Sequence, residues 1–163
     1  MIRPAPILHL VCGKPAAGKS TLTARLGAAD DTLVISEDSW LAALYGAQMQ
    51  TLQDYLRWSA ALRQAMTPHV TALLRARVSV VLDFPANTVE TRGWMRALAE
   101  AAGVPARLHL LEVPDAVCKA RLRARNAAGD HPFTLSEDQF DRLAAHFVPP
   151  AAEEGFEIVH HDG

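Results

Sequence analysis

The strongest chemical signal in the sequence is a short segment with two glycines, a lysine and a serine at fixed spacing. Residues 13–20 read GKPAAGKS and satisfy the pattern G-x-x-x-x-G-K-[ST]. Glycine at these positions lets successive backbone N–H groups point inward around a phosphate. Lys19 is placed to reach the β and γ phosphates of a nucleoside triphosphate, and the Ser20 hydroxyl to bind Mg²⁺. The predicted nucleotide-binding residues are Gly13, Lys14, Pro15, Ala16, Ala17, Gly18, Lys19, Ser20 and Thr21.

Two carboxylates follow predicted strands and could act on a bound nucleotide. Asp83 ends the apolar run 79–83, which places it at the carboxyl edge of a sheet, where ligands bind in open α/β folds. We expect it to hold Mg²⁺ with Ser20, and the alternative is an acidic cap or turn residue. Asp38 is the candidate catalytic base, because a carboxylate near an acceptor hydroxyl can orient it and accept its proton. Glu37 competes for that role, and both acids also suit the first turn of a helix.

Arginines could supply the positive charge that a migrating phosphoryl group needs. Arg121 and Arg125 are four residues apart and share one face of a predicted helix. We expect them to neutralise that charge when a lid around residues 119–135, with a mobile loop at 126–132, closes over the site. The alternative is a solvated basic face, which is the interpretation preferred for Arg123. The predicted catalytic residues are Asp38, Lys19, Arg121 and Arg125.

A second group of residues has weaker signals and forms a tentative acceptor site. Its members are Trp40, Tyr55, Arg57, Asn87 and Arg92. The aromatic residues belong to a segment that could line an acceptor pocket, and core packing explains most of them equally well. Asn87 could contact substrate, but its spacing from Glu90 also resembles a helix-capping box. Arg92 is equally compatible with a substrate contact and with an exposed position on a helix.

The elements that must position these residues alternate along the chain. Five apolar runs have the length of buried strands, at residues 7–11, 33–36, 79–83, 107–112 and 156–159. Helical patterns lie between them, and the longest is interrupted by Pro68, which should either kink one helix or begin a second with Thr67 as its N-cap. Ser136 and Gln139 predict a capping box for the last helix. This alternation predicts the α/β class, with a parallel sheet covered on both faces.

Composition limits the classes of function. A chain of 163 residues, 50% hydrophobic and 21% charged, predicts one globular domain spanning residues 1–163. With 16 basic and 18 acidic residues the net charge is −2, so any nucleic-acid contact would have to be local and no anionic membrane would be attracted. The two cysteines match no zinc or disulfide pattern, and no apolar run could span a bilayer, so a cytoplasmic protein is expected. His160 and His161 read as a fraying tail rather than a metal site.

The order of these motifs resembles the P-loop kinases of the group that includes polynucleotide kinase, zeta toxin, chloramphenicol phosphotransferase and gluconate kinase. The resemblance covers nearly the whole chain, from the glycine loop through Asp38, Asp83 and Arg92 to Arg121 and Arg125. It implies a three-layer P-loop NTPase fold with a five-stranded parallel sheet of order 2-3-1-4-5 and a small arginine-bearing lid. It also implies ATP and Mg²⁺ as cofactors and a substrate hydroxyl oriented by Asp38.

One departure from this group bears on the acceptor. Several members that act on phosphate-bearing acceptors carry an arginine three residues after the catalytic acid, where this sequence has Leu41. The leading hypothesis is therefore an ATP-dependent phosphotransferase that moves the γ-phosphate to a hydroxyl of a neutral or polar small molecule. A polynucleotide 5′-hydroxyl kinase is an alternative, against which the lack of a basic run counts. A nucleotide-dependent switch that hydrolyses ATP slowly is another, although a switch needs no acceptor base.

Overall fold

The computed structural model describes residues 3–129 and 134–163. In chain order the elements are β1 (Leu8–Cys12), α1 (Lys19–Gly27), β2 (Thr32–Ser36), α2 (Glu37–Tyr45), η1 (Gly46–Gln48), α3 (Leu52–Arg75), β3 (Ser79–Asp83), α4 (Val89–Ala102), β4 (Ala106–Leu111), α5 (Asp115–Ala128), α6 (Glu137–Ala145), η2 (Ala152–Glu154) and β5 (Glu157–His161). All five predicted apolar runs form strands, with bounds that differ from the prediction by at most two residues.

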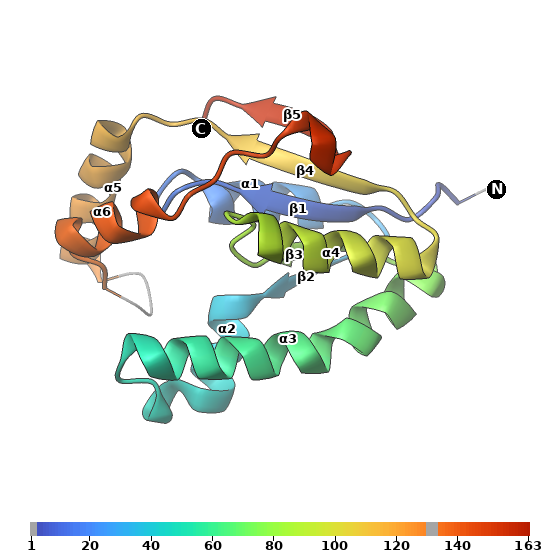
Figure 1. Cartoon of the computed structure of the whole chain (residues 1–163), viewed down its shortest axis with the longest axis horizontal. Helices are drawn as coiled ribbons and strands as arrows, with labels where there is room; N and C mark the ends of the chain where they lie inside the picture. Colours follow the sequence, from blue (N-terminus) through green and yellow to red (C-terminus); the bar gives the residue numbers. More distant parts are fainter. Residues whose placement is uncertain (1–2, 130–133) are drawn as a thin grey trace.

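The strands form one parallel sheet in the order β2-β3-β1-β4-β5, which confirms the order implied by the resemblance. Successive strands run in the same direction because a helix carries the chain back after each of them. Figure 1 shows that α5 and α6 lie at the end of the sheet toward which the strands point. The loop after β1, the start of α2 and the end of β3 meet at this same edge.

Two hydrophobic cores, one on each face of the sheet, follow from the alternation of side chains along the strands. On one face, Leu8 and Leu10 of β1 pack with residues of α3 and α4, which Figure 1 shows along one side of the sheet. On the other face, Val11 belongs to a cluster with Leu22 of α1, and residues of α5 and α6 complete it. The sheet is therefore the middle of three layers, as predicted.

Pro68 lies inside α3, so the long pattern is one helix and not two. The helix begins at a capping box formed by Thr51 and Asp54 rather than at Thr67. Thr67 instead donates a hydrogen bond from its hydroxyl to the carbonyl of Arg63 (2.8 Å), a local side-chain bond that is compatible with a helix interior. The axis of α3 turns toward its C-terminal end (Figure 1), consistent with the missing N–H of the proline.

The C-terminal histidines do not form a fraying tail. His160 and His161 lie in β5, which pairs with β4. His161 Nε2 is 2.9 Å from Nδ1 of His109, and Nε2 of His109 is 3.0 Å from Nδ1 of His9. Three imidazoles thus form a hydrogen-bonded row across β1, β4 and β5. Within residues 3–129 and 134–163, no group of three or more His, Cys, Asp or Glu side chains is arranged to hold a metal ion.

The longest helix, α3, lacks the continuous apolar character of a membrane-spanning segment. No other helix in the described part of the chain is long and apolar enough to cross a bilayer.

Candidate active site

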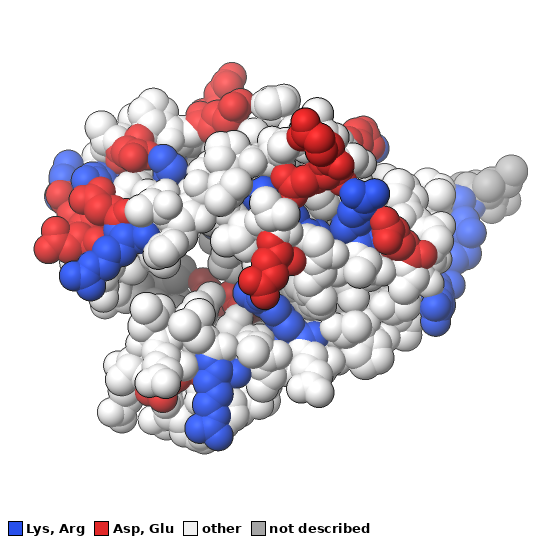
Figure 2. Space-filling model, in the orientation of Figure 1, with Lys and Arg blue, Asp and Glu red and all other residues white. Residues whose placement is uncertain are grey.

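A cavity of about 850 Å³ opens at the carboxyl edge of the sheet. Figure 2 shows the surface hollowed between α3 and the α6 side of the molecule, with acidic atoms visible inside the hollow. Most of the residues predicted for the site lie on the wall of this cavity. They are Lys14, Pro15, Ala16, Gly18, Lys19, Ser20, Thr21, Asp38, Tyr55, Asp83, Asn87, Arg121 and Arg125.

The glycine loop has the backbone geometry of a phosphate cradle. Gly18 has φ 103°, and Ala16 also has a positive φ of 60°. A Cβ atom at Gly13 would come within 3.1 Å of Leu111 Cβ, so a larger residue would crowd this close approach to β4. Helix α1 begins directly after Gly18 with neither a side-chain cap nor an acidic residue in its first turn. Its first N–H groups and the positive end of its dipole are therefore suited to an anion.

Lys19 is the half-buried cation of the loop. Its ammonium group donates hydrogen bonds to the carbonyls of Gly13 and Lys14, both at 2.8 Å. Burial lowers the pKa of Lys19 to about 8, although the negative charges of Asp83 and Asp38 act in the opposite direction. The side chain is thus charged at neutral pH and held within the loop.

Asn87 holds the first glycine of the loop in place and does not cap α4. Its Oδ1 accepts a hydrogen bond from the Gly13 N–H (3.0 Å), and its Nδ2 donates one to the Gly13 carbonyl (2.9 Å). The predicted capping box with Glu90 is wrong, because Thr88 is the N-cap and accepts a hydrogen bond from the N–H of Thr91. Both backbone polar groups of Gly13 are therefore engaged by a side chain from the β3–α4 connection.

The two neighbouring acids at the start of α2 have different environments. Glu37 is only 1% exposed, and it accepts hydrogen bonds from the hydroxyls of Tyr55 (2.9 Å) and Ser59. Burial raises the pKa of Glu37 above its usual range, and these hydrogen bonds oppose the shift. Asp38 lies on the cavity wall, whereas Glu37 does not. Of the two acids, Asp38 is the one that faces the cavity.

The predicted Mg²⁺ ligands lie on the same cavity. Asp83 is the last residue of β3 and pairs in register with Ser36 at the end of β2. Both Asp83 and Ser20 contribute to the wall, and both offer the oxygen donors that Mg²⁺ prefers. The donor set fits a Mg²⁺ ion that takes most of its other ligands from nucleotide phosphates and water.

Arginines of α5 lie beside the loop. Arg121 and Arg125 are on the cavity wall, and Arg121 donates a hydrogen bond to the carbonyl of Ala17 (3.4 Å). Arg123 points elsewhere and pairs with Glu137 at the surface. Residues 130–133, which belong to the predicted lid and mobile loop, lie outside the described residues, so the lid stays a prediction.

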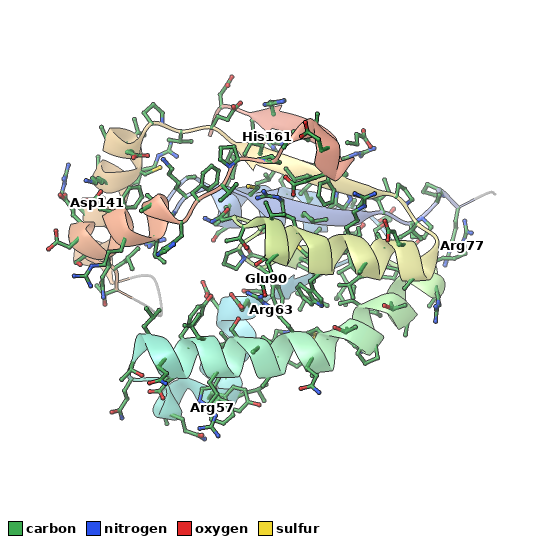
Figure 3. The ribbon with its side chains drawn as sticks, in the orientation of Figure 1. Arg57, Arg63, Arg77, Glu90, Asp141 and His161 are labelled. Atoms are coloured by element: carbon green, nitrogen blue, oxygen red, sulfur yellow. The ribbon has the colours of Figure 1, made fainter. Side chains whose placement is uncertain are left out.

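Three of the tentative acceptor residues do not lie on the cavity wall. Trp40 is 40% exposed on α2. Arg57 is exposed beside the Trp58 ring, 4.7 Å from its centroid, and points away from the cavity in Figure 3. These two positions follow from the helix faces that carry them, which are turned away from the sheet edge.

Arg92 is neither an exposed helix residue nor a wall residue of the cavity. It is fully buried and forms a bidentate ion pair with Glu154, at 2.7 and 3.1 Å. A further nitrogen donates to the carbonyls of Ala86 (3.0 Å) and Val148 (2.8 Å). The hydrogen bonds that Arg92 donates to the Glu154 carboxylate lower the pKa of Glu154. The donors of Arg92 are committed to joining α4 to the segment before β5, so its geometry contradicts a substrate contact.

The structure adds cavity residues that sequence reasoning missed. They include Arg63, Thr88, Thr91, Gln139, His146 and Phe147. Arg63 had a usable signal, because Tyr55, Ser59 and Arg63 are spaced four residues apart and share one face of α3. The others are brought to the cavity by long-range packing that no local pattern indicates.

Comparisons with known proteins agree with this architecture. The sequence profile of the AAA_33 family, described as an AAA domain, matches residues 8–150. A candidate kinase from Chloroflexus aurantiacus superposes with a TM-score of 0.76 at 18% identity, covering 96% of this chain and 85% of that chain. Kti12 from Chaetomium thermophilum, solved with ADP-AlF3, has a TM-score of 0.70 at 16% identity, with 95% and 89% covered. A gluconokinase from Sinorhizobium meliloti has a TM-score of 0.62 at 17% identity, with 99% and 86% covered. No curated protein sequence matches the chain significantly.

Proposed function

The chain belongs to the AAA_33 family, and we propose that it is an ATP-dependent phosphotransferase that moves the γ-phosphate to a hydroxyl group of a small molecule. The observation that carries this proposal is the joint position of Lys19 and Asp38 on one cavity wall. Lys19 belongs to a phosphate cradle, and Asp38 is an acid that a nucleotide-binding switch would not need. The cavity of about 850 Å³ also lies within the range of about 300–1,000 Å³ typical of small-molecule sites.

The proposed reaction is an in-line displacement at the γ-phosphorus. The loop N–H groups and Lys19 bind the triphosphate, and Arg121 and Arg125 neutralise the charge of the migrating phosphoryl group. Asp38 orients the acceptor hydroxyl and takes its proton as the new P–O bond forms. The bond between the γ-phosphorus and the bridging oxygen breaks, and ADP leaves. Mg²⁺, when held by Ser20 and Asp83, supplies positive charge to the phosphate oxygens.

The named structures in the comparison are compatible with this class of reaction. One is described as a gluconokinase and another was solved with the nucleotide complex ADP-AlF3. Because their identity with this chain is below 20%, they support the fold, and the choice of a small-molecule acceptor rests on the cavity.

Transfer of label from [γ-³²P]ATP tests the proposal. The protein is incubated with pools of hydroxyl metabolites, aminoglycosides, nucleosides and oligonucleotides, and labelled products are separated. We expect a labelled small molecule, and Asp38→Asn should lower its formation about 10²–10⁴-fold while nucleotide binding persists. Asp30→Asn, a change at an exposed acid away from the cavity, should leave the rate unchanged.

The other outcomes separate the competing functions. Label found only on oligonucleotides would favour a polynucleotide kinase, and hydrolysis without any labelled product would favour the switch. Full activity of Asp38→Asn would exclude Asp38 as the base.

A further inference from the structure

The wall of the cavity includes a cationic side chain from α3, on a different element from the phosphate loop. Arg63 is a wall residue, and Figure 3 shows it in the space between α3 and α4. We propose that Arg63 binds an anionic group, a carboxylate or a phosphate, on the acceptor molecule. This inference rests on the proposed function and specifies the class of its acceptor as acidic.

The guanidinium of Arg63 forms no direct ion pair within the part of the chain that the structure describes. Its Nε atom is buried without a hydrogen-bond partner, and no hydrogen bond or ion pair of this side chain occurs among residues 3–129 and 134–163. A guanidinium carries five N–H donors in a rigid fork that matches the geometry of a carboxylate or phosphate. Keeping such a group in a partly buried place without a partner is unfavourable, and an anion in the cavity would relieve that cost.

The neighbouring side chains hold this cation in place without neutralising it by contact. The guanidinium carbon lies 5.7 Å from the centroid of the Trp94 ring, an arrangement that favours a cation over the ring face. Glu37 lies within its electrostatic reach, and Arg63 lowers the pKa of that carboxyl group. The Glu37 oxygens, however, accept the hydroxyl hydrogen bonds of Tyr55 and Ser59.

Arg63 acts on the acceptor side of the cavity rather than on the nucleotide. The positive charge of Arg63 acts to lower the pKa of Glu37 and of Tyr55. These two residues form part of the contact between α2 and α3. The acids that act on the loop lysine are Asp83 and Asp38. Because Asp38 follows Glu37 directly, the proposed base and Arg63 are carried by the same pair of helices.

Leu41 no longer argues for a neutral acceptor. Its side chain has no exposed area and belongs to the core cluster that contains α3 and α4. The leucine at this position of α2 packs into the core and does not line the cavity. The absence of an arginine there is therefore uninformative, and Arg63 supplies the cation from the neighbouring helix.

Three related probes test the inference without knowledge of the natural acceptor. Glycerate carries a carboxylate, glycerol 3-phosphate carries a phosphate, and glycerol is neutral, while all three have hydroxyl groups. The protein is first saturated with Mg²⁺ and AMPPNP to fill the phosphate loop, and the Nε–H resonances of its arginines are followed by ¹H–¹⁵N NMR. The Arg63 resonance is assigned from its loss in Arg63→Lys.

We expect the Arg63 resonance to shift with one or both anionic probes in the millimolar range and not with glycerol. The probe that acts identifies the group as carboxylate or phosphate. Arg63→Gln should weaken binding of that probe at least about tenfold, as the loss of a charge-assisted hydrogen bond predicts, and Arg63→Lys should retain part of the affinity. Arg57→Gln, on the outward face of α3, is the matched control and should bind normally.

Equal shifts with glycerol, or no shift with any probe, would overturn the inference. A thermal melt establishes whether Arg63→Gln is folded. If Arg63→Gln does not fold, the affinity of Arg63→Lys for the same probe is compared with that of the wild type instead. The transfer assay separates the two proposals. A labelled neutral acceptor whose KM is unchanged by Arg63→Gln would refute the acidic acceptor alone, whereas anion binding at Arg63 without any labelled product would refute the phosphotransferase alone.

Discussion

Replacing Arg92 by methionine tests the reassignment of this residue from substrate contact to structural pair. The change removes the guanidinium, which has no exposed area, and leaves the Glu154 carboxylate, 14% exposed, without its cation. It also leaves the carbonyls of Ala86 and Val148 without their donor. Breaking a buried ion pair on one side costs about 3–5 kcal/mol. For a domain of this size each kcal/mol lowers Tm by about 2–4 °C, so Tm should fall by about 6–20 °C.

Urea unfolding and thermal melts of a double-mutant cycle measure this effect. Glu154→Gln should also destabilise, and the double variant should lose less than the sum of the two, with a coupling of about 1–3 kcal/mol. Arg123→Met is the control, because its ion pair with Glu137 is exposed and is expected to contribute about 0–1 kcal/mol. A Tm within 2 °C of wild type for Arg92→Met, or a stable variant with a raised acceptor KM, would refute the structural role and restore the substrate contact.

Three further predictions concern the loop and the histidine row. Asn87→Ala removes both side-chain hydrogen bonds to the Gly13 backbone and should weaken binding of a fluorescent ATP analogue about tenfold. Thr88→Ala removes the helix cap instead, and it should cost only about 1 kcal/mol of stability and leave affinity unchanged. Burial lowers the pKa of His109 from 6.5 to about 4, so the unfolded chain binds its proton first and stability should fall as pH drops from 6.5 toward 4. Urea unfolding should find this loss reduced in His109→Gln. The pKa of Lys19 near 8 predicts constant ATP affinity below that pH and a decline above it, as the ammonium loses its proton, with no such inflection in Lys19→Ala.

The parts of this protein that could be predicted are those encoded over a few neighbouring residues. The loop at residues 13–20 depends on glycines, a lysine and a serine within eight consecutive residues. Strand β3 matches its apolar run in full, because a strand buried on both faces needs continuous hydrophobic residues. Asp83 then follows from the direction of the strand, since every parallel strand ends at the same edge.

The parts that could not be predicted depend on pairs far apart in the chain. Asn87 and Gly13 are separated by 74 residues, and Arg92 and Glu154 by 62. Nothing in the sequence around Asn87 distinguishes a residue that caps a helix from one that hydrogen-bonds to the glycine loop. The neighbouring Thr88 is also a favourable N-cap residue, and it caps α4 in the structure. The end of β5 was missed for a related reason, because its two histidines are polar and only their pairing with β4 makes them part of a strand.

The geometry of α2 explains how two adjacent acids come to have different roles. Successive residues of an α-helix project about 100° apart, so Glu37 and Asp38 cannot face the same surroundings. Tyr55 and Ser59 of α3 engage Glu37 in the interior, and this contact turns Asp38 toward the cavity. Glu37 thereby fixes α2 against α3, the helix that carries Arg63 one turn beyond Ser59. In the proposed enzyme, the buried acid would set the distance between the base at the acceptor hydroxyl and the cation at the acceptor's anionic group.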